Sequence, residues 1–473
     1  MTPEIHSTPD TLHLDSHTLA DLNLFGSAEN TGLFGYCDYC KTDGGRVALK
    51  RRMMSPWASP ENILATQESI AYISVHREVF SALPSAYLAS NIDRYLGAGM
   101  PVVRAKNSVE FGLDAFHLWA NYDNYYAKII HGVALSQRFL LSISELLEYL
   151  DVHRASGELI GLISEMQTLM RSAELTRVMQ AQRVEQFWQK LRLDQCLRLY
   201  EKTKLIRLLE ICYELDALVS LADVTHKRGL VMPLIKTGPT AVSASELVHP
   251  LLKNPVGNPL ALAQVGRVLF LTGPNMAGKT TYLRAILTAL YFAHLGMGVP
   301  AKAFSFVPVQ RLITSISLSD NLADGISFFR AEALRVKAVA QALARGGRTI
   351  AIMDEPFKGT NVKDALDASF EVIRRFALKH DSLFVISSHL IELEEPLAAV
   401  KSMDYWYFEA QERGSGLVFD YRVRKGISGQ RLGMRVLYEE GVFDLLNADN
   451  DPSDGDGREE GPPTHFDTPT TPI

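Results

Sequence analysis

In the first half of the chain, apolar residues recur at spacings of three and four, which predicts long helices. One such run consists of Leu140, Ile143, Leu146, Leu147 and Leu150. Residues 133–228 contain no proline, and the stretch 159–228 is long enough for one or two helices of more than about 20 residues. We therefore expect a domain of long helices, a core or lever, over residues 12–236, after a flexible N-terminus at residues 1–11.

A turn-rich break at residues 237–240 marks the expected start of a second domain. Beyond it, short apolar runs alternate with helical patterns, which is typical of β-α-β units on a mostly parallel sheet. The expected strand and helix pairs are 268–271 with 281–295, 349–353 with 365–378, and 383–386 with 390–398. The predicted fold class is thus α + α/β, with the α/β domain at residues 237–446. Residues 447–473 hold five prolines and almost no apolar residues, which predicts a disordered acidic tail.

The net charge of the chain does not by itself identify a binding partner. Lys and Arg total 48 and Asp and Glu total 54, a formal net charge of −6. Residues 449–473 alone contain seven acids and one base, so residues 1–448 are neutral. A neutral body does not identify a nucleic-acid-binding protein, and such a function has to rest on local patches or motifs. With 473 residues, of which 47% are hydrophobic and 22% charged, the chain is long enough for two to four globular domains.

The sequence also predicts the compartment. The N-terminus has no basic start followed by an apolar core, so we expect no signal peptide. The longest apolar stretch, 285–299, is interrupted by His294 and two glycines and is too short to span a bilayer. Four cysteines without an export signal fit a reducing cytoplasm, so we expect a cytoplasmic protein without membrane contact. Cys37 and Cys40 form a lone C-x-x-C, which we interpret as two half-buried thiols on one helical face rather than a zinc site, because no second ligand pair follows.

The strongest chemical signal is a glycine-rich loop between a predicted strand and a predicted helix. It matches G-x-x-x-x-G-K-[ST] and consists of Gly273, Pro274, Asn275, Met276, Ala277, Gly278, Lys279 and Thr280, followed by Thr281. Glycines allow backbone amides to surround phosphate oxygens at a helix N-terminus, Lys279 reaches the outer phosphates, and the Thr280 hydroxyl can ligate Mg²⁺. The alternative is a chance glycine-rich turn. The strand–loop–helix context favours a nucleotide site.

A second buried strand, 349–353, ends in the adjacent acids Asp354 and Glu355. Asp354 can hold magnesium through water, while Glu355 is placed to orient or deprotonate an attacking water. A base beside the metal ligand favours hydrolysis over phosphotransfer, although the same pattern also fits a strand ending in a solvated acidic pair. A third strand delivers His389 to the same expected edge of the sheet, where it could sense the γ-phosphate. A histidine at a strand end is by itself more often a surface residue.

These motifs resemble the MutS mismatch-repair ATPases. Residues 272–284 are similar to the ATP-binding loop of that family, whose usual phrase is TGPNMGGKST followed by Y-x-R, and residues 320–332 resemble its signature segment, D-x-L-x-x-G-x-S-x-F-x-x-E. The resemblance implies an ABC-type P-loop ATPase domain that uses ATP and Mg²⁺ and forms a homodimer with composite sites. It also implies that Ser327 of the signature approaches the nucleotide of the opposite subunit. Ser327 could equally be a helix N-cap.

The similarity extends over about residues 12–446 and is strong in 249–436 and looser before them. Residues 354–360 and 388–389 resemble the family's D-E-x-x-x-G-T and T-H phrases, and 421–436 its closing strand and glycine turn. In the helical half, Thr42-x-x-Gly45 and residues 214–218 resemble the start of the core and the end of the lever helices. The chain begins directly at the core, so we expect no mismatch-recognition domain and a reduced clamp or none. Pro255 stands where some members place an aromatic residue against adenine, which leaves base selectivity open.

Two features bear on DNA contact. Residues 171–208 contain nine bases and four acids, a balance that could contact phosphates or simply form the solvated face of a helix. An aromatic cluster could stack on bases, but its helical spacing favours packing between lever helices. Its members are Phe116, Trp119, Tyr122, Tyr125 and Tyr126.

The sequence thus predicts a MutS-like, Mg²⁺-dependent ATPase whose dimeric arms clamp duplex, mismatched or branched DNA, in mismatch repair or recombination. One alternative is a nucleotide-switched protein that grips a protein or ribonucleoprotein partner without direct DNA recognition. The other is a P-loop kinase for a small metabolite, which the Asp354–Glu355 pair and the large helical arm disfavour.

Overall fold

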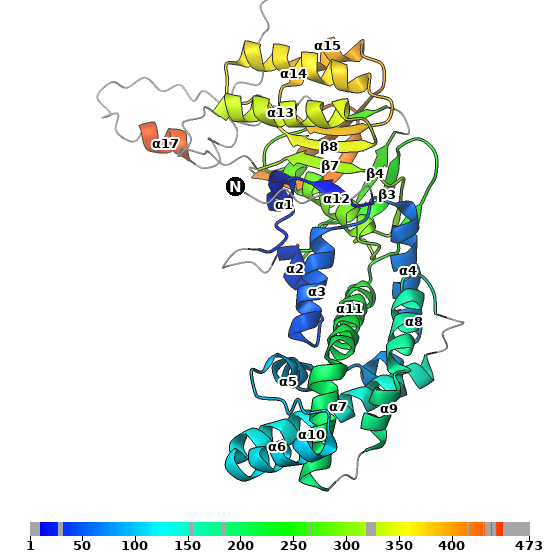
Figure 1. Cartoon of the computed structure of the whole chain (residues 1–473). Helices are drawn as coiled ribbons and strands as arrows, with labels where there is room; N and C mark the ends of the chain where they lie inside the picture. Colours follow the sequence, from blue (N-terminus) through cyan, green and yellow to red (C-terminus); the bar gives the residue numbers. More distant parts are fainter. Residues whose placement is uncertain are drawn as a thin grey trace, which may run out of the picture.

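The computed structural model describes two parts, a long helical arm and a domain built on β-sheets (Figure 1). The described residues are 10–26, 32–150, 155–181, 185–263, 266–317, 328–413, 416–428, 430, 437 and 441–447. Most of the expected N-terminal segment 1–11 and of the expected tail 447–473 lies outside these ranges. Among the described residues, no helix is both long enough and apolar enough to cross a membrane.

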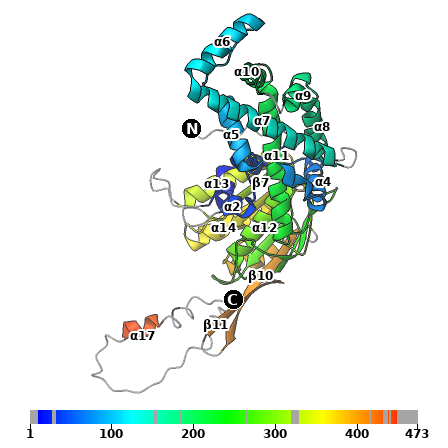
Figure 2. The ribbon, with the colours of Figure 1, turned by 90° about the horizontal axis from the view of Figure 1, so that it is seen from below.

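The arm consists of helices that run along and across one another (Figures 1 and 2). They are α2 (Gly32–Cys37), α3 (Asp43–Met54), α4 (Pro60–Val75), α5 (Ala86–Gly97), α6 (Ser108–Asn121), α7 (Asp123–Tyr149), α8 (Leu159–Met170), α9 (Ala173–Gln180), α10 (Phe187–Gln195) and α11 (Lys202–Lys227). A 3₁₀ turn covers Val79–Ala82, and a π-helical turn at Cys196–Tyr200 joins α10 to α11. The long proline-free stretch therefore forms long helices as expected, with 27 residues in α7 and 26 in α11.

The sheet domain contains two sheets and the helices that cover them. The strands are β1 (His13–Leu14), β2 (Leu234–Ile235), β3 (Val242–Leu247), β4 (Asn258–Leu262), β5 (Val268–Thr272), β6 (Ala303–Phe306), β7 (Arg311–Ser315), β8 (Thr349–Asp354), β9 (Leu383–Ser387), β10 (Met403–Arg413) and β11 (Gly416–Lys425). The helices are α1 (Ser16–Asp21), α12 (Lys279–His294), α13 (Phe328–Ala344), α14 (Val362–Ala377), α15 (Glu394–Ala398) and α17 (Val442–Asn447), with a 3₁₀ turn at Ile391–Leu393.

The larger sheet has the strand order β1-β7-β8-β9-β5-β10-β11, and all of its pairs are parallel except β10 with β11. This confirms the predicted mostly parallel sheet. Every residue of β5 and β9 is buried, because helices cover both faces of the sheet, and such strands appear in the sequence as unbroken apolar runs. The smaller sheet has the order β2-β6-β3-β4.

The two faces of the larger sheet belong to different hydrophobic cores. Leu269 and Leu271 of β5 lie in the core shared with α12 and the arm, whereas Val268 and Phe270 lie in the core under α13 and α14. This division follows from the alternation of side chains along a strand. Helix α12 is consequently enclosed between the sheet and the arm, and nearly all of its residues are buried.

The beginning of the chain joins the sheet domain rather than the arm. Strand β1 pairs with β7, with His13 opposite Arg311. The Asp21 carboxylate at the end of α1 accepts hydrogen bonds from Ile316 N and Ser317 N, at 2.9 and 2.8 Å. The expected helical domain at 12–236 thus contributes its first residues to the other part of the molecule. A two-residue strand leaves no periodic pattern in the sequence, which is why this pairing was not predicted.

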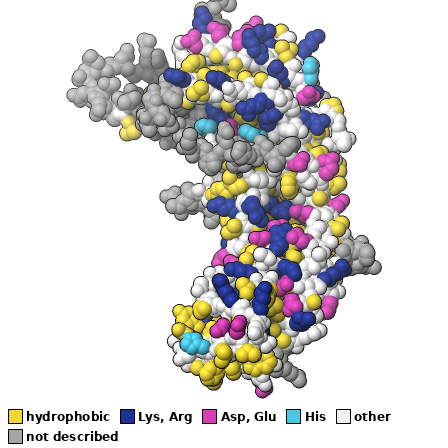
Figure 3. Space-filling model, in the orientation of Figure 1, with side chains coloured by type: hydrophobic (Ala, Val, Ile, Leu, Met, Phe, Trp, Pro, Cys, Tyr) yellow, Lys and Arg dark blue, Asp and Glu magenta, His cyan; other side chains and the backbone are white. Residues whose placement is uncertain are grey.

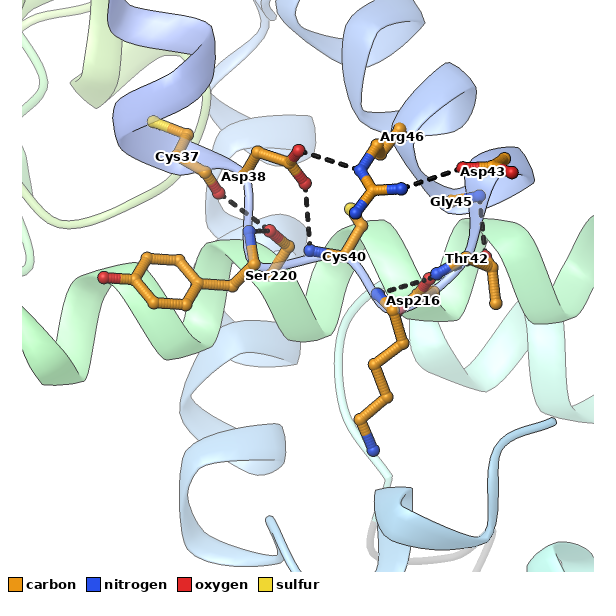
Figure 4. A network of polar contacts seen from close by, with 11 residues as sticks. Cys37, Asp38, Cys40, Thr42, Asp43, Gly45, Arg46, Asp216 and Ser220 are labelled. Atoms are coloured by element: carbon orange, nitrogen blue, oxygen red, sulfur yellow. Dashed lines mark hydrogen bonds and ion pairs between the residues drawn. The ribbon is translucent and has the colours of Figure 1, made fainter. Parts of the chain in front are cut away.

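A buried polar network fastens α2 and α3 to α11 (Figure 4). The Asp216 carboxylate of α11 accepts hydrogen bonds from Lys41 N at 3.1 Å, Thr42 N at 2.9 Å and Thr42 Oγ1 at 2.7 Å. Thr42 also caps α3 by accepting from Gly45 N at 2.9 Å. The Thr42-x-x-Gly45 phrase and the 214–218 phrase therefore meet in space, and Asp216 is the contact between them.

The two thiols of the C-x-x-C pair lie beside this network. Cys37 ends α2 and is completely buried, and Cys40 lies in the turn before α3 and is also buried. Burial raises the pKa of Cys40 to about 12 and raises that of Cys37 as well. The expectation of two half-buried thiols on one helical face was therefore wrong, because the helix ends between them. In the described part of the chain, no group of three or more His, Cys, Asp or Glu side chains is arranged to hold a metal ion.

Candidate active site

The glycine-rich loop lies at the carboxyl end of β5, directly before α12. Its two glycines have positive φ, +136° at Gly273 and +104° at Gly278. A side chain on Gly273 would collide with the backbone of Phe408, 2.7 Å from its carbonyl oxygen. Met276 in the same loop also has a positive φ of +68°, a conformation that costs energy in a residue with a Cβ and that recurs at functional sites. The loop before α12 thus depends on backbone conformations that glycine adopts most readily.

Lys279 is buried and lies under this loop. Its ammonium group donates hydrogen bonds to Gly273 O at 2.8 Å and Pro274 O at 3.2 Å, and lies 3.7 Å from Glu355 Oε1. Burial lowers the pKa of Lys279, and the nearby Glu355 and Asp354 carboxylates oppose that effect. The ammonium group is bound to loop carbonyls and is shielded from water. A phosphate that replaced these carbonyls would therefore bind a positive charge that is already desolvated.

Asp354 receives two hydroxyl groups at the end of β8. Thr280 Oγ1 donates to Asp354 Oδ2 at 2.5 Å, and Ser387 Oγ donates to Asp354 Oδ1. The contacts bring together residues 74 and 33 positions apart, because β8 and β9 are neighbours and their carboxyl ends share an edge with β5. A hydroxyl and a carboxylate oxygen in contact are the hard ligands that Mg²⁺ prefers. The pair predicted as metal ligands is therefore together.

Glu355 follows Asp354 on the strained backbone that leaves β8, with φ of +46° at Glu355 and +69° at Phe357. His389 Nδ1 lies 3.7 Å from Glu355 Oε2. The His389 ring lowers the pKa of Glu355 and Lys279 lowers it further, while burial acts in the opposite direction. Glu355 consequently stays ionised well below neutral pH, as a proton acceptor requires.

A cavity of about 690 Å³ opens over the loop, which is within the range of small-molecule sites. One wall is formed by Asn275, Met276, Lys279 and Thr280, and another by Asp354 and Glu355. The remaining walls come from the segment between β3 and β4 and from the β10–β11 hairpin. They contain His249, Pro255, Phe408 and Tyr421. His389 does not line the cavity, although its Nδ1 lies 3.7 Å from Glu355 Oε2.

Three of these wall residues were not predicted from the sequence. Tyr421 is half exposed, has a φ of +56°, and its carbonyl accepts from Asn258 Nδ2 at 2.9 Å. Phe408 lies in the strand that pairs with β5. Burial, with a smaller contribution from Arg284, lowers the pKa of His249 to about 4, so that its ring is neutral at pH 7. For Tyr421 the sequence offered one signal, the resemblance of residues 421–436 to the family's closing strand and glycine turn. In the structure Asn258 joins β4 to the strand that carries Tyr421.

The signature segment is described only from Phe328 onward, and Ser327 lies outside the described residues. Phe329 packs against Phe357, with ring centroids 5.9 Å apart. The Glu332 carboxylate accepts from Lys358 N and Gly359 N, both at 3.2 Å. The end of the signature thus holds the turn that follows Glu355.

The fold consists of an α/β domain attached to a helical arm. The edge of the sheet in the α/β domain has the groups that bind a phosphorylated ligand. Two family models match the chain, MutS domain III over residues 17–222 and MutS domain V over residues 269–445. Both describe parts of one family and together they cover more than half of the sequence, so this chain belongs to the MutS family. Domain V, which carries the candidate site, is the ATPase domain of that family, and the resemblance drawn from the motifs is confirmed at this level.

Proposed function

We propose that this protein is a Mg²⁺-dependent ATPase that works as a homodimer and uses ATP to open and close its helical arm on duplex or branched DNA. The observation that carries the proposal is the convergence of Thr280, Asp354, Lys279 and Glu355 at one end of the sheet. The contact of Thr280 with Asp354 is 2.5 Å, and that of Lys279 with Glu355 is 3.7 Å. The match to MutS domain V supports the same assignment.

Each residue of the loop then has a role. The backbone N–H groups of the loop 273–280, a group that Pro274 lacks, and the Lys279 ammonium bind the phosphates of ATP, a P-loop arrangement. Thr280 and Asp354 would hold Mg²⁺, which when bound neutralises charge on the phosphates. Glu355 orients a water and accepts its proton, and its lowered pKa keeps it ready to do so. His389 positions Glu355, and Ser327 is proposed to reach the site of the partner subunit.

Two substitutions test the site. Lys279→Ala should weaken ATP binding, because a buried positive charge that meets the phosphates is removed. Glu355→Gln should still bind ATP but lose turnover by roughly 10² to 10⁴, the usual contribution of general base catalysis. Lys363→Ala and Glu395→Gln are matched controls, since both side chains are exposed on helices outside the cavity. Unchanged phosphate release in both site variants would show that the chemistry occurs elsewhere.

One observation favours the alternative, in which the arm grips a protein rather than DNA. Half of the eight described bases in the stretch 171–208 form ion pairs within the arm, among them Arg198 with Asp194 at 2.6 Å, Lys204 with Glu201 at 2.8 Å, and Arg207 with Glu165 at 2.7 Å. Arg198 and Asp194 are buried, and Arg183 lies outside the described residues. Paired bases release few counterions from DNA, so this stretch offers a DNA backbone fewer free positive charges than its nine bases suggest.

A binding series separates the two candidates. The protein is titrated with fluorescent duplex, mismatched and branched DNA at several salt concentrations, with and without ATP. DNA binding that weakens with salt would support the clamp, and the slope would count the phosphates contacted. If no DNA binds even at low salt while ATP turnover is normal, the protein-gripping alternative is favoured and the ATPase assignment stands.

A further inference from the structure

The strands of the larger sheet begin at the edge opposite to the glycine-rich loop. Strands β7, β8, β9, β5 and β10 lie side by side in this order and are parallel, so all five start at this edge. Strand β8 covers six residues, and a strand rises about 3.3 Å per residue. The starting edge therefore lies about 20 Å from Asp354 and Glu355, the acids of the candidate active site.

Basic residues gather in the segments that lead into or begin these five strands. The segments are 266–267, 310–311, 345–348, 379–382 and 401–402. We call the basic edge the set Arg267, Arg311, Arg345, Arg348, Lys379 and Lys401. Asp381 is the one acid in the same segments, so six bases stand against one acid and leave an excess of five positive charges. Because residues 1–448 are neutral as a whole, this excess is local.

Hydrogen bonds to the backbone orient two guanidinium groups of the basic edge. Arg348 Nη2 donates to Gly238 O at 2.9 Å, and Arg267 Nη1 donates to Thr240 O at 3.2 Å. A carbonyl oxygen has no formal charge, so these contacts leave the positive charge of each arginine uncompensated. Both arginines are half-buried, and their side chains have lost part of their rotamer freedom before any ligand arrives. Less ordering is then required when an anion binds.

No member of the basic edge forms an ion pair with a residue that the structure describes. The ion pairs of the sheet domain involve other bases, such as Arg335 with Asp15 at 2.7 Å and Arg374 with Glu371 at 3.0 Å. Figure 3 shows Lys and Arg side chains from the sheet domain to the end of the arm. The lack of acidic partners, rather than the number of bases, therefore distinguishes the basic edge.

The ends of two helices account for a small part of this charge. Helices α13 and α14 end at Ala344 and Ala377, next to the basic edge. The C-terminal end of a helix carries about −0.5 elementary charge, so the two ends together contribute about −1. The basic edge has an excess of five positive charges. Most of that charge is therefore left for an external anion.

The composition of the edge favours a nucleic acid over a protein as that anion. The five segments contain no apolar side chain. Protein–protein interfaces have an apolar centre with aromatic residues, whereas interfaces with DNA are more polar and more positively charged. Four of the six bases are arginines, which bind a phosphate through two parallel hydrogen bonds.

The length of the edge also suits a phosphate backbone. Neighbouring strands lie about 4.8 Å apart, so five strands span about 19 Å. One strand of duplex DNA carries a phosphate every ~3.4 Å of helix axis, and about five phosphates fall within that length. The edge has no aromatic or apolar side chain that could contact a base. Contacts to phosphate alone carry no sequence information.

We propose that the basic edge is a binding site for the phosphate backbone of nucleic acid and that it binds duplex DNA irrespective of sequence. The proposal rests on the proposed function, which makes DNA a ligand of this protein. It adds a site on the sheet domain, separate from the arm and from the nucleotide cavity. Half of the described bases in the arm segment 171–208 are in ion pairs, whereas the bases of this edge are unpaired among the described residues.

Removal of three charges tests this site. Arg345, Lys379 and Lys401 are exposed, and their side chains form no hydrogen bond with the described part of the chain. The variant Arg345→Gln/Lys379→Gln/Lys401→Gln should therefore fold as the parent does. Its affinity for a fully paired fluorescent duplex is measured by anisotropy over a series of salt concentrations. Each lost phosphate contact lowers the slope of log K against log salt by about 0.9, so the slope should fall by about 2–3 and the affinity at low salt by roughly tenfold or more.

A matched control removes three exposed charges elsewhere on the sheet domain. Lys302→Gln/Lys337→Gln/Lys363→Gln changes the net charge equally and should keep the slope of the parent. ATP turnover without DNA should be equal in all three proteins. If the parent binds DNA and the edge variant keeps its slope, or the control loses as much, this proposal is overturned while DNA binding itself stands. A parent that binds no DNA at the lowest salt overturns both the DNA-binding function and this site.

Chemical protection locates the contact in the parent protein. Acetylation of Lys379 and Lys401, followed by mass spectrometry, should slow several-fold when duplex DNA is bound. Lys337 and Lys363 should react at the same rate with and without DNA. Unchanged rates at Lys379 and Lys401 would show that DNA lies elsewhere. Protection of these two lysines by poly-glutamate but not by DNA would overturn the proposal and assign the edge to an acidic protein.

Discussion

Replacing Gly45 by alanine tests the junction between α3 and α11. Glycine inside a helix normally costs about 1 kcal/mol relative to alanine, so this substitution usually stabilises a protein. At Gly45 the new Cβ would lie 2.1 Å from Asp216 Oδ2 and 2.9 Å from Thr42 Oγ1. Figure 4 shows that these atoms belong to the same network. Because both distances are below van der Waals contact, the Asp216 carboxylate has to move.

The cost can be estimated from what that movement breaks. Asp216 is buried and accepts hydrogen bonds from Lys41 N, Thr42 N and Thr42 Oγ1. A buried polar group left without its partner costs about 1–3 kcal/mol, and overpacking costs about 1–3 kcal/mol. After the gain of about 1 kcal/mol in helix propensity, the net loss is about 1–5 kcal/mol. At roughly 2–4 °C per kcal/mol, the figure for a unit of about 150–250 residues such as the arm, the Tm of the arm should fall by on the order of 10 °C.

Thermal unfolding followed by circular dichroism measures this shift. Gly161 is the matched control, since it lies in the first turn of α8 and, its chain neighbours and the backbone of its own helix aside, no atom of the described residues lies within 4 Å of the point that an alanine methyl would occupy. Gly161→Ala should leave Tm unchanged or raise it by a few degrees, on the order of 1 kcal/mol. In the double variant Gly45→Ala/Asp216→Ala the alanine at position 45 should cost less than it does alone, because the colliding carboxylate is absent. A Gly45→Ala protein as stable as the parent would refute the reasoning.

Three further expectations concern the site and the arm. His389→Ala removes the main group that lowers the pKa of Glu355, so the acid limb of the kcat/KM profile should move to higher pH, and an unmoved limb would contradict this contact. Tyr421→Ala should raise KM for ATP several-fold while Tyr421→Phe does not, because the ring lines the cavity; equal KM values would exclude a role for the ring. Arg198→Ala leaves the buried Asp194 carboxylate unpaired, which should cost about 3–5 kcal/mol, and an unaltered urea midpoint would show that the pair contributes nothing.

The parts of the site that local patterns predict are those formed next to parallel strands. Strand β5 and the loop after it follow one another along the chain, so about a dozen consecutive residues determine their conformation. Asp354 and His389 could be expected at one edge because β8 and β9 are both apolar runs of a parallel sheet, and the carboxyl ends of such strands meet. The approach of His389 Nδ1 to within 3.7 Å of Glu355 Oε2 agrees with that expectation.

Other parts depend on pairings that no local pattern contains. Strand β1 has two residues and pairs with β7 almost 300 positions later. Tyr421 reaches the cavity through an irregular antiparallel hairpin, in which the register shifts between Phe408 and Ala410. The helical spacing of the aromatic cluster predicts a helix, but periodicity does not tell that Phe116 and Trp119 stay 55% and 43% exposed.

Helix α12 connects the glycine-rich loop directly to the arm, so a displacement at the loop can be transmitted to the arm through one helix. Its first residues, Lys279 and Thr280, belong to the candidate site, and its last turn contacts the arm. Tyr291 Oη donates to Met53 O at 2.6 Å. His294 Nδ1 lies 2.6 Å from Trp57 O, and since a carbonyl only accepts, Nδ1 carries the proton. A helix that is buried along its length moves as a unit, because a close-packed interior does not deform gradually. A ligand that shifts the start of α12 therefore has to shift the end of α3 and the segment before α4, or open a destabilising cavity between them.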